Sequence, residues 1–103
     1  MRNGVNVINN TAAQRFEVRL GDGAVAFADY SLLEGKVMFP HTVVPAEHEG
    51  QGIGSALARS ALAWAREEKL AVVPTCSFFV TYMQRHPDTQ DLLDPEYAAL
   101  IGR

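Results

Sequence analysis

The sequence predicts a mixed α+β domain built on a mostly antiparallel sheet of about five strands, with two to three helices. Three observations support this fold class. Apolar and polar residues alternate in short runs over residues 5–44, which is the period of half-buried strands. The spacing of apolar residues becomes helical from about residue 52, and a short valine-rich run follows that helix. Several strands, then a helix and one further strand, are typical of a mixed sheet covered by helices.

The first three strands are predicted over residues 5–9, 15–20 and 25–32. Phe16, Val18 and Leu20 alternate with three charged residues, so we expect the apolar side chains on a buried face and the charged ones in solvent. The sequence Gly21-Asp22-Gly23 indicates a hairpin turn between the second and third strands. The third strand is longer than the others, and we expect a bulge near Asp29.

A fourth strand is predicted to end near Val43-Val44. In this strand Val37, Phe39 and His41 are expected to share one face, because they are two residues apart. Pro40 interrupts the run, and a proline has no N–H group to donate to a neighbouring strand. We therefore expect an edge position, a bulge or a splayed end at this point of the strand.

The second half of the chain predicts three helices and a fifth strand. The helices are expected over residues 52–68, 77–85 and 92–101, and the strand over residues 70–73. In the first helix Ile53, Leu57 and Ala61 recur every four residues, which places them on one buried face. The second helix should stop before His86-Pro87, because the residue before a proline is pushed out of the helical conformation.

Length and composition indicate one domain that spans residues 1–103, because this length supports a single core. The formal net charge of −3 gives no broad basic field, so a nucleic acid is not an expected partner. No apolar run approaches the ~20 residues that cross a bilayer, and we expect a cytoplasmic protein without a membrane partner. Cys76 is the single cysteine, so it is either a buried thiol or a reactive one. The potential metal ligands lack paired spacing, and no metal is expected.

The most informative motif is a loop in which glycines alternate over residues 49–54, between the fourth strand and the first helix. Glycine lets a ligand approach the main chain, and a helix N-terminus attracts anions, so the loop predicts a site for a phosphorylated cofactor. Its G-x-G-x-G spacing and late position do not fit a dinucleotide fold, and it lacks the Gly-Lys-Ser/Thr of a Walker loop. Glu47 and His48, just before it, are expected on an exposed turn.

The order of these elements resembles the GNAT N-acetyltransferase superfamily, and specifically its short single-domain branch. The matching stretches are residues 43–57, 72–78 and 82–87, within a resemblance that covers most of the chain from Phe27 to Pro87. The resemblance implies a GNAT-like acyl-CoA N-acyltransferase fold in which the fourth and fifth strands splay apart. Glu49 stands where the superfamily usually has Arg or Gln. Because a carboxylate repels a diphosphate, we expect the Glu49 side chain to point away and main-chain amides to hold the phosphates.

The resemblance further implies acetyl-coenzyme A as the acetyl donor. Its diphosphate would lie on the amides of Gln51, Gly52, Ile53, Gly54 and Ser55, and its pantetheine arm beside Val43 and Val44. His41 is a candidate base for the acceptor amine, since imidazole titrates near neutral pH. Cys76, just before the second helix, is a candidate nucleophile that would form an acetyl-enzyme. Tyr82 matches the tyrosine that protonates the coenzyme A thiolate in many superfamily members. The sequence does not decide between the His41 and Cys76 routes.

Three classes of function therefore stay open. The first is an N-acetyltransferase that acts on a small-molecule or peptide amine. The second is a module that binds or senses coenzyme A without catalysis, because the helices that larger members carry between the first two strands are reduced to residues 10–13. The third is a redox-responsive interaction protein that uses Cys76. Neither the acceptor nor the oligomeric state can be inferred from a motif.

Overall fold

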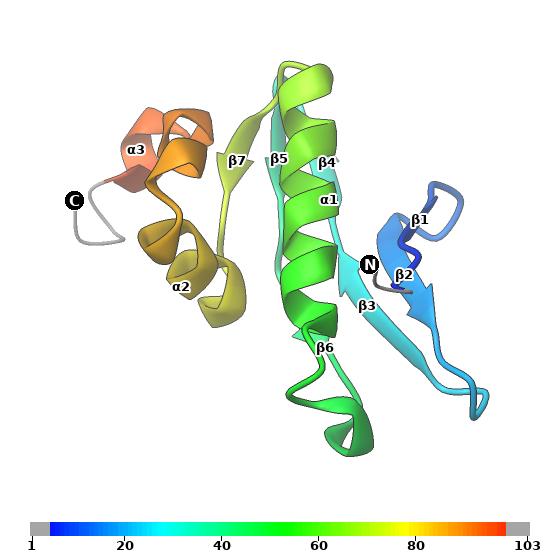
Figure 1. Cartoon of the computed structure of the whole chain (residues 1–103). Coiled ribbons are helices and arrows are strands. Elements are labelled where there is room, and N and C mark those ends of the chain that lie inside the picture. Colours follow the sequence, from blue (N-terminus) through cyan, green and yellow to red (C-terminus); the bar gives the residue numbers. More distant parts are fainter. Residues whose placement is uncertain (1–4, 99–103) are drawn as a thin grey trace.

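The computed structural model describes residues 5–98, and its strands form two small sheets that share one core (Figure 1). The first sheet has the order β1-β2-β3-β6 and is antiparallel throughout. Its strands are β1 (Ile8–Asn10), β2 (Arg15–Arg19), β3 (Val25–Asp29) and β6 (Thr42–Val43). The second sheet has the order β4-β5-β7, with strands β4 (Ser31–Leu33), β5 (Lys36–Met38) and β7 (Ala71–Val73). In it β4 is antiparallel to β5, and β5 is parallel to β7.

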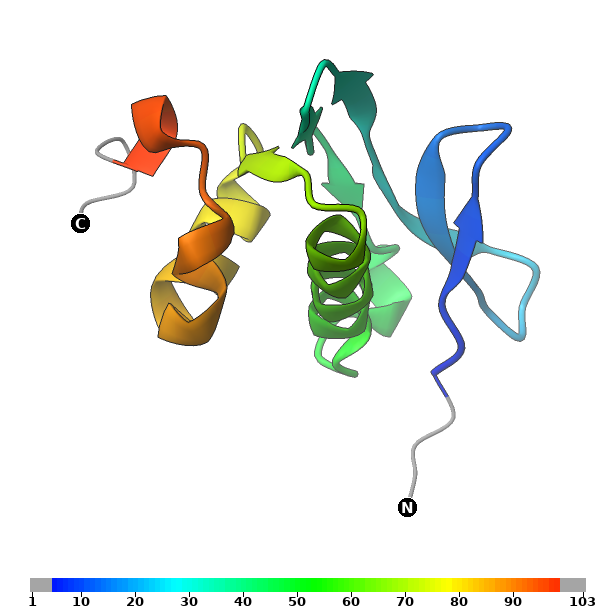
Figure 2. The same cartoon turned by 90° about the horizontal axis from the view of Figure 1, so that it is seen from above.

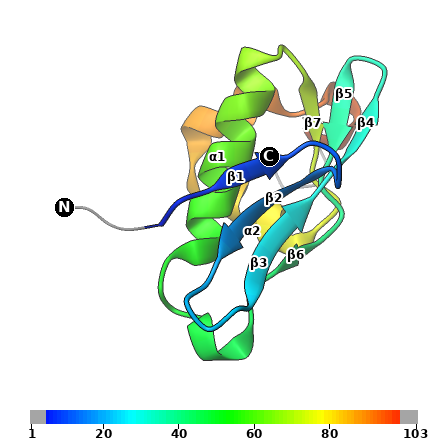
Figure 3. The ribbon, with the colours of Figure 1, turned by 90° about the vertical axis from the view of Figure 1, so that its right-hand side faces the viewer.

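The helix α1 (Ile53–Glu67) lies along the concave side of the strands, which curve around it when the molecule is seen from above (Figure 2). Ile53, Leu57 and Ala61 are buried, as their spacing predicts, and four alanines on this face allow a close approach to the sheets. Figure 3 shows β2 and β3 side by side across α1, and both strands contact the helix. None of the helices within residues 5–98 is long and apolar enough to cross a membrane.

Two of the predicted strands are each divided between the sheets. The predicted third strand is broken at Tyr30, whose N–H donates to the carbonyl of Gln14 at 2.9 Å. The predicted fourth strand is broken over residues 39–41, around Pro40. Five predicted strands therefore correspond to seven strand segments, because the chain twists enough at each break to join a different sheet.

The splay between the fourth and fifth predicted strands is present. β5 pairs with β7, and Phe39 extends this pairing by donating its N–H to the carbonyl of Val73 at 3.1 Å. Beyond Pro40 the chain leaves β7 and pairs with β3 as β6, so β6 and β7 lie in different sheets. This divergence opens the structure next to the start of α1, where the candidate site lies.

The C-terminal part returns to the outer edge of β7. The helix α2 (Ser77–Arg85) has the predicted bounds and is followed by the 3-10 helix η2 (Pro87–Leu92) and by α3 (Pro95–Ala98). Asp94 donates its N–H to the carbonyl of Val72 at 2.9 Å, and its carboxylate pairs with Lys36 at 2.9 Å. The predicted last helix over residues 92–101 is represented by α3, and residues 99–101 lie outside the described residues.

Glu17 in β2 is buried, although the alternation places it among the side chains expected in solvent. Its exposed fraction is 4%, and its carboxylate accepts hydrogen bonds from Asn10 at 3.0 Å and from Arg15. The Arg15 guanidinium lies over the ring of Phe27, 4.5 Å from its centroid, and helps to cover the carboxylate. The hydrogen bond from Arg15 is the main cause of a lowered pKa for Glu17, which keeps this buried group ionised.

Candidate functional site

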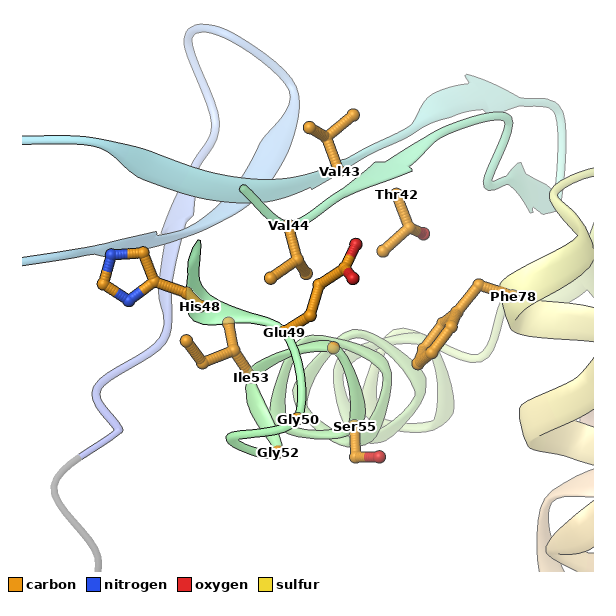
Figure 4. A pocket seen from close by; sticks show the side chains of 11 residues that line it. Thr42, Val43, Val44, His48, Glu49, Gly50, Gly52, Ile53, Ser55 and Phe78 are labelled. Atoms are coloured by element: carbon orange, nitrogen blue, oxygen red, sulfur yellow. The ribbon is translucent and has the colours of Figure 1, made fainter. Parts of the chain in front are cut away.

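A cavity of about 580 Å³ lies between β6 and the N-terminal end of α1 (Figure 4). Six of the seven residues predicted to hold the cofactor line it, namely Val43, Val44, Gly52, Ile53, Gly54 and Ser55. Five more lining residues were not predicted, and these are Thr42, His48, Glu49, Gly50 and Phe78. Gln51 does not line this cavity, and instead lines a neighbouring hollow with His48, Ile53 and Arg19.

The loop before α1 exposes a row of backbone amides. Gly50 and Gly52 have φ angles of +85° and +81°, which are left-handed conformations that favour glycine. Within the described chain, the amides of Gly50 and Gly52 donate to no backbone carbonyl. The first intrahelical bond of α1 comes from Ala56, so the three amides before it are also unused by the helix. Unused amides at a helix N-terminus form a site for an anion.

Gly54 has a different role from the other two glycines. A Cβ atom added to Gly54 would lie 2.8 Å from Cζ of Phe78, which is closer than real contacts allow. The Phe78 ring, 37% exposed, lies against the first turn of α1 and lines one side of the cavity (Figure 4). Glycine at this position therefore makes room for a side chain of α2.

Glu49 corrects one expectation, because its side chain does not point away from the site. The residue follows the 3-10 helix η1 (Ala46–His48), has an extended backbone with φ −67° and ψ 149°, and lines the cavity. Its carboxylate projects between Val44 and Thr42 on the β6 side, and Gly50 and Gly52 lie below it in the view of Figure 4. The cavity therefore contains one carboxylate as well as the free amides.

His48 also corrects an expectation, because it is not a simple exposed turn residue. Its side chain is 19% exposed, and Nε2 lies 3.0 Å from Oδ2 of Asp22 in the β2–β3 turn. On the other side of the ring, Nδ1 lies 3.4 Å from Oε1 of Gln51. The bond with Asp22 is the largest cause of a raised pKa for His48, and the same bond is the largest cause of a lowered pKa for Asp22.

Cys76 immediately precedes α2, at the point where the strands diverge. Its N–H donates to the carbonyl of Phe39 at 3.1 Å, which fixes the backbone, and its Sγ donates to Oγ1 of Thr42 at 3.4 Å. Thr42 lines the cavity, whereas Cys76 does not. The thiol is partly exposed, and its hydrogen bond to Thr42 connects it to the wall of the cavity.

These features were compared with known proteins. A sequence model of the family described as GCN5-related N-acetyl-transferase matches residues 15–92. The chain belongs to the GCN5-related N-acetyltransferase family. The NMR solution structure of a GCN5-like protein from Staphylococcus aureus has a TM-score of 0.70 to this N-acetyltransferase. The match covers 90% of this chain and 91% of that chain at 23% sequence identity, and it shows a shared fold. No curated protein sequence matches the chain significantly.

In this N-acetyltransferase His41 lies on a different face from the one expected. Asp29 and His41 are bonded across β3 and the start of β6, and both lie on the face opposite to Thr42 and Ala28. The His41 side chain is 68% exposed, and Nδ1 lies 3.0 Å from Oδ2 of Asp29. The prediction that His41 shares a face with Val37 and Phe39 was wrong, because the strand is broken around Pro40, where the chain passes from one sheet to the other.

Tyr82 lies in a second cavity of about 320 Å³, between α1, α2 and η2. Its ring stacks on His86 with the centroids 3.9 Å apart, and the carbonyl of Tyr82 lies 2.7 Å from Nδ1 of the same histidine. The two cavities have no lining residue in common. The fold thus brings Cys76 to the first cavity through Thr42, and leaves His41 and Tyr82 outside its lining.

Some of the missed residues had a signal in the sequence. Thr42 alternates with His41 and so must face the other side of the strand, which is the side of the cavity. Phe78 follows Cys76 within the first turn of α2, so it was bound to lie near the strand ends. The contact between His48 and Asp22 had no signal, because the two residues are 26 positions apart.

Proposed function

We propose that this family member transfers an acetyl group from acetyl-coenzyme A to a small-molecule or peptide amine. One observation carries the proposal: the cavity opens where β6 leaves β7 and is bordered by unused amides at the start of α1. Its volume of about 580 Å³ falls in the range of ligand pockets. The family match to residues 15–92 supports acyl transfer as the chemistry.

The lining residues suggest how the donor substrate would lie. The diphosphate would accept hydrogen bonds from the amides of residues 51–55, where the helix dipole adds a partial positive charge. The pantetheine arm would follow Val43 and Val44, since β6 pairs with β3 on one edge and, within residues 5–98, has no strand on its other edge. In this orientation the thioester would lie near Thr42, within reach of the Cys76 thiol.

The contact of Cys76 with Thr42 favours a covalent route over direct transfer. The Cys76 thiolate would attack the thioester carbonyl carbon, and the coenzyme A thiolate would leave with the electron pair and take up a proton. The amine would then attack the acetyl-cysteine, lose its proton to a base, and release the amide together with the Cys76 thiolate. Thr42 can donate a hydrogen bond to the thiolate or to the oxyanion.

His41 is the proposed base for the amine. If Nδ1–H donates to Asp29 at 3.0 Å, Nε2 is left with its lone pair and can accept a proton. Because His41 lies on the sheet face opposite to Thr42, this role would require the amine to reach Nε2 around the free edge of β6. In a direct route without an acetyl-enzyme, the same nitrogen would take the proton. The role of Tyr82 as proton donor to the coenzyme A thiolate would require the thiolate to reach the second cavity.

Intact-protein mass spectrometry with labelled acetyl-coenzyme A tests this proposal. We expect one acetyl adduct on the wild type, loss of the adduct in Cys76→Ala, and discharge of the adduct when an acceptor amine is added. His41→Ala should still form the adduct but discharge it slowly. Undiminished amine acetylation by Cys76→Ala would eliminate the covalent route and leave direct transfer with His41 as base.

A coenzyme A binding module is the second candidate, and one observation favours it. The chain between β1 and β2 is only a tight turn over residues 11–14, closed by a hydrogen bond from the Gln14 N–H to the Thr11 carbonyl at 3.2 Å. No helix in this described segment walls an acceptor site beside the cavity. Coenzyme A binding by calorimetry, with no adduct and no transfer to any amine of a chemically diverse panel, would establish the module and refute catalysis.

A further inference from the structure

The side chain of His48 connects the loop that carries the free amides to the β2–β3 turn. This side chain lies between Asp22 in the β2–β3 turn and Gln51 in the loop, with ring-to-oxygen distances of 3.0 Å and 3.4 Å. Gln51 separates Gly50 and Gly52, the two glycines with left-handed backbone conformations. Neither η1 nor α1 has a side-chain cap at its N-terminus. The His48 contacts are therefore the side-chain hydrogen bonds that reach the loop within the described residues.

The geometry indicates which protonation state of His48 completes these contacts. Both of its partners, the Asp22 carboxylate and the Gln51 side-chain oxygen, are hydrogen-bond acceptors. A neutral imidazole has one N–H and can donate to only one of them. The imidazolium has two N–H groups and donates to both. With Oε1 of Gln51 toward the ring, as in the structure, the full bridge from the β2–β3 turn to the loop requires protonated His48.

The charged groups around His48 determine how readily it is protonated. Asp22 faces it from the β2–β3 turn, and Glu47 adds negative charge from η1. Glu49 follows it in the loop, and Arg19 from β2 lines the same hollow as His48 and opposes its charge. The hydrogen bond with Asp22 outweighs the loss of solvation, which is the largest opposing effect, and the pKa of His48 is therefore raised.

We propose that His48 is a positioning residue, whose imidazolium form holds the glycine loop against the β2–β3 turn and thereby strengthens binding of coenzyme A. The inference rests on the proposed function, because it takes the loop amides as the diphosphate site. A loop held in its binding conformation loses less conformational entropy when the ligand arrives, so affinity rises. The charge of the imidazolium also favours the anionic ligand, whereas Glu49 opposes it.

The sign of the pH dependence follows from this arrangement. Below its pKa His48 donates to both acceptors, and the loop is held. As the pH rises through that pKa, one of the two contacts loses its proton and the loop is released from Asp22 or from Gln51. Coenzyme A affinity is therefore expected to fall between pH 6 and pH 8.5, by roughly tenfold for each unit by which ligand binding raises the pKa of His48.

Calorimetric titration with coenzyme A at several values between these two pH limits tests the inference. The variants are Asp22→Asn and His48→Gln, and Asp91→Asn is the matched control, because Asp91 pairs with Arg66 far from the loop. The phosphates of coenzyme A also titrate, so the ratio of wild-type to variant affinity is the quantity to compare. We expect this ratio to fall by roughly threefold to tenfold from pH 6 to pH 8.5 for both variants at the bridge. It should stay constant for Asp91→Asn.

NMR titration of the ring protons of the three histidines follows the ionisation of His48 directly, both without and with the ligand. We expect the pKa of His48 to fall in Asp22→Asn and to rise when coenzyme A is added to the wild type. Equal pH dependence in the wild type and His48→Gln, with coenzyme A bound by both, would refute the inference alone. Absence of coenzyme A binding at every pH would refute the proposed function and this inference together, while the apo titration would still test the ion pair.

Discussion

At the scale of single residues, Glu49 gives the cavity between β6 and α1 its negative charge. It places a carboxylate in the same cavity as the unused amides of the loop, where the superfamily resemblance would put Arg or Gln. An anionic ligand is therefore attracted by the start of α1 and repelled by the preceding residue. The balance between these two effects sets the affinity, because both lie within a few residues of the proposed diphosphate position.

Glu49→Gln is expected to bind coenzyme A about threefold to tenfold more tightly, since it removes one like charge and keeps the shape of the side chain. The gain should shrink at high salt, which screens the repulsion. Calorimetry at two ionic strengths measures both effects. Glu67→Gln is the control, because Glu67 is exposed at the other end of α1 and does not line the cavity. Weaker binding by Glu49→Gln would mean that the carboxylate contacts the ligand favourably.

Gly54 and Phe78 form a second residue-scale pair. In a Phe78→Ala background, Gly54→Ala should stabilise the protein by about 0.5–1 kcal/mol, because alanine is the better helix former. In the wild type the added Cβ meets the Phe78 ring at 2.8 Å, so the same change should lose this gain or become destabilising. Urea denaturation of the four proteins measures the coupling. Equal effects in both backgrounds would show that the ring moves away without cost.

At the scale of elements, the molecule depends on segments that leave one sheet and join another. The break at Tyr30 and the break around Pro40 lie next to each other, because β3 pairs with β6 on one side of them and β4 pairs with β5 on the other. Phe39, between these pairings, stacks on Phe79 of α2 with the ring centroids 4.5 Å apart. The aromatic contact fixes α2, and with it Cys76, relative to the strand ends.

The C-terminal segment is held to β7 mainly through Asp94. Asp94 is 3% exposed. Its carboxylate pairs with Lys36 and accepts a hydrogen bond from the N–H of Glu96 at 3.2 Å. Asp94→Asn should lower the Tm by about 5–10 °C, because it removes the charge partner of Lys36 and weakens the start of α3. Faster hydrogen exchange at the amides of residues 94 and 96 should accompany the change.

Asp91→Asn provides the comparison for Asp94→Asn. The side chain of Asp91 is 64% exposed and that of its partner Arg66 is 51% exposed, so loss of this ion pair should change the Tm much less. Equal shifts for the two variants would contradict the importance given to the buried carboxylate.

At the scale of the whole molecule, stability should depend on pH in both directions. The pKa values of Glu17 and Asp22 are lowered from 4.5 and 3.8, so their contributions are present above those values and are lost as the pH falls through the folded pKa values. The pKa of His48 is raised from 6.5, so its contribution is complete below that value and is lost as the pH rises through the folded pKa. We expect the highest Tm between about pH 4.5 and pH 6.5.

Thermal denaturation from pH 3 to pH 9 measures this profile, and the decline on the alkaline side should be smaller in His48→Gln. Such a variant isolates the histidine from the other groups that titrate above pH 8. A Tm that is constant between pH 6 and pH 8 in the wild type would contradict the contribution of the His48–Asp22 pair.

The sequence predicted the features that depend on local pattern. The bounds of α2 follow from Pro87, and the buried face of α1 follows from the spacing of Ile53, Leu57 and Ala61. The breaks that divide two strands were only partly predicted, because the bulge expected near Asp29 and the proline at position 40 mark both places but do not show that the chain changes sheets there. The burial of Glu17 could not be predicted either, since it depends on side chains that cover it from other strands.

The loop and strand of the candidate site could be predicted from the sequence, whereas the directions of several of its side chains could not. The glycine loop and β6 line the cavity as expected, because a strand-to-helix turn with free amides is a local property. The directions of Glu49 and His41, and the pairing of His48 with Asp22, depend on how distant segments meet. The separation of Tyr82 from the first cavity likewise depends on the packing of α2 and η2 against α1.

Cys76 has one further consequence, which concerns experiment more than mechanism. It is the only cysteine of the chain, and its Sγ lies 3.4 Å from a threonine of the cavity wall. A thiol-reactive fluorophore, spin label or electrophilic fragment would attach at this one position without any engineered mutation. Fragments that extend from this anchor would sample the space expected to receive the acceptor amine. The fragments that react fastest would then provide a chemical description of the unknown substrate.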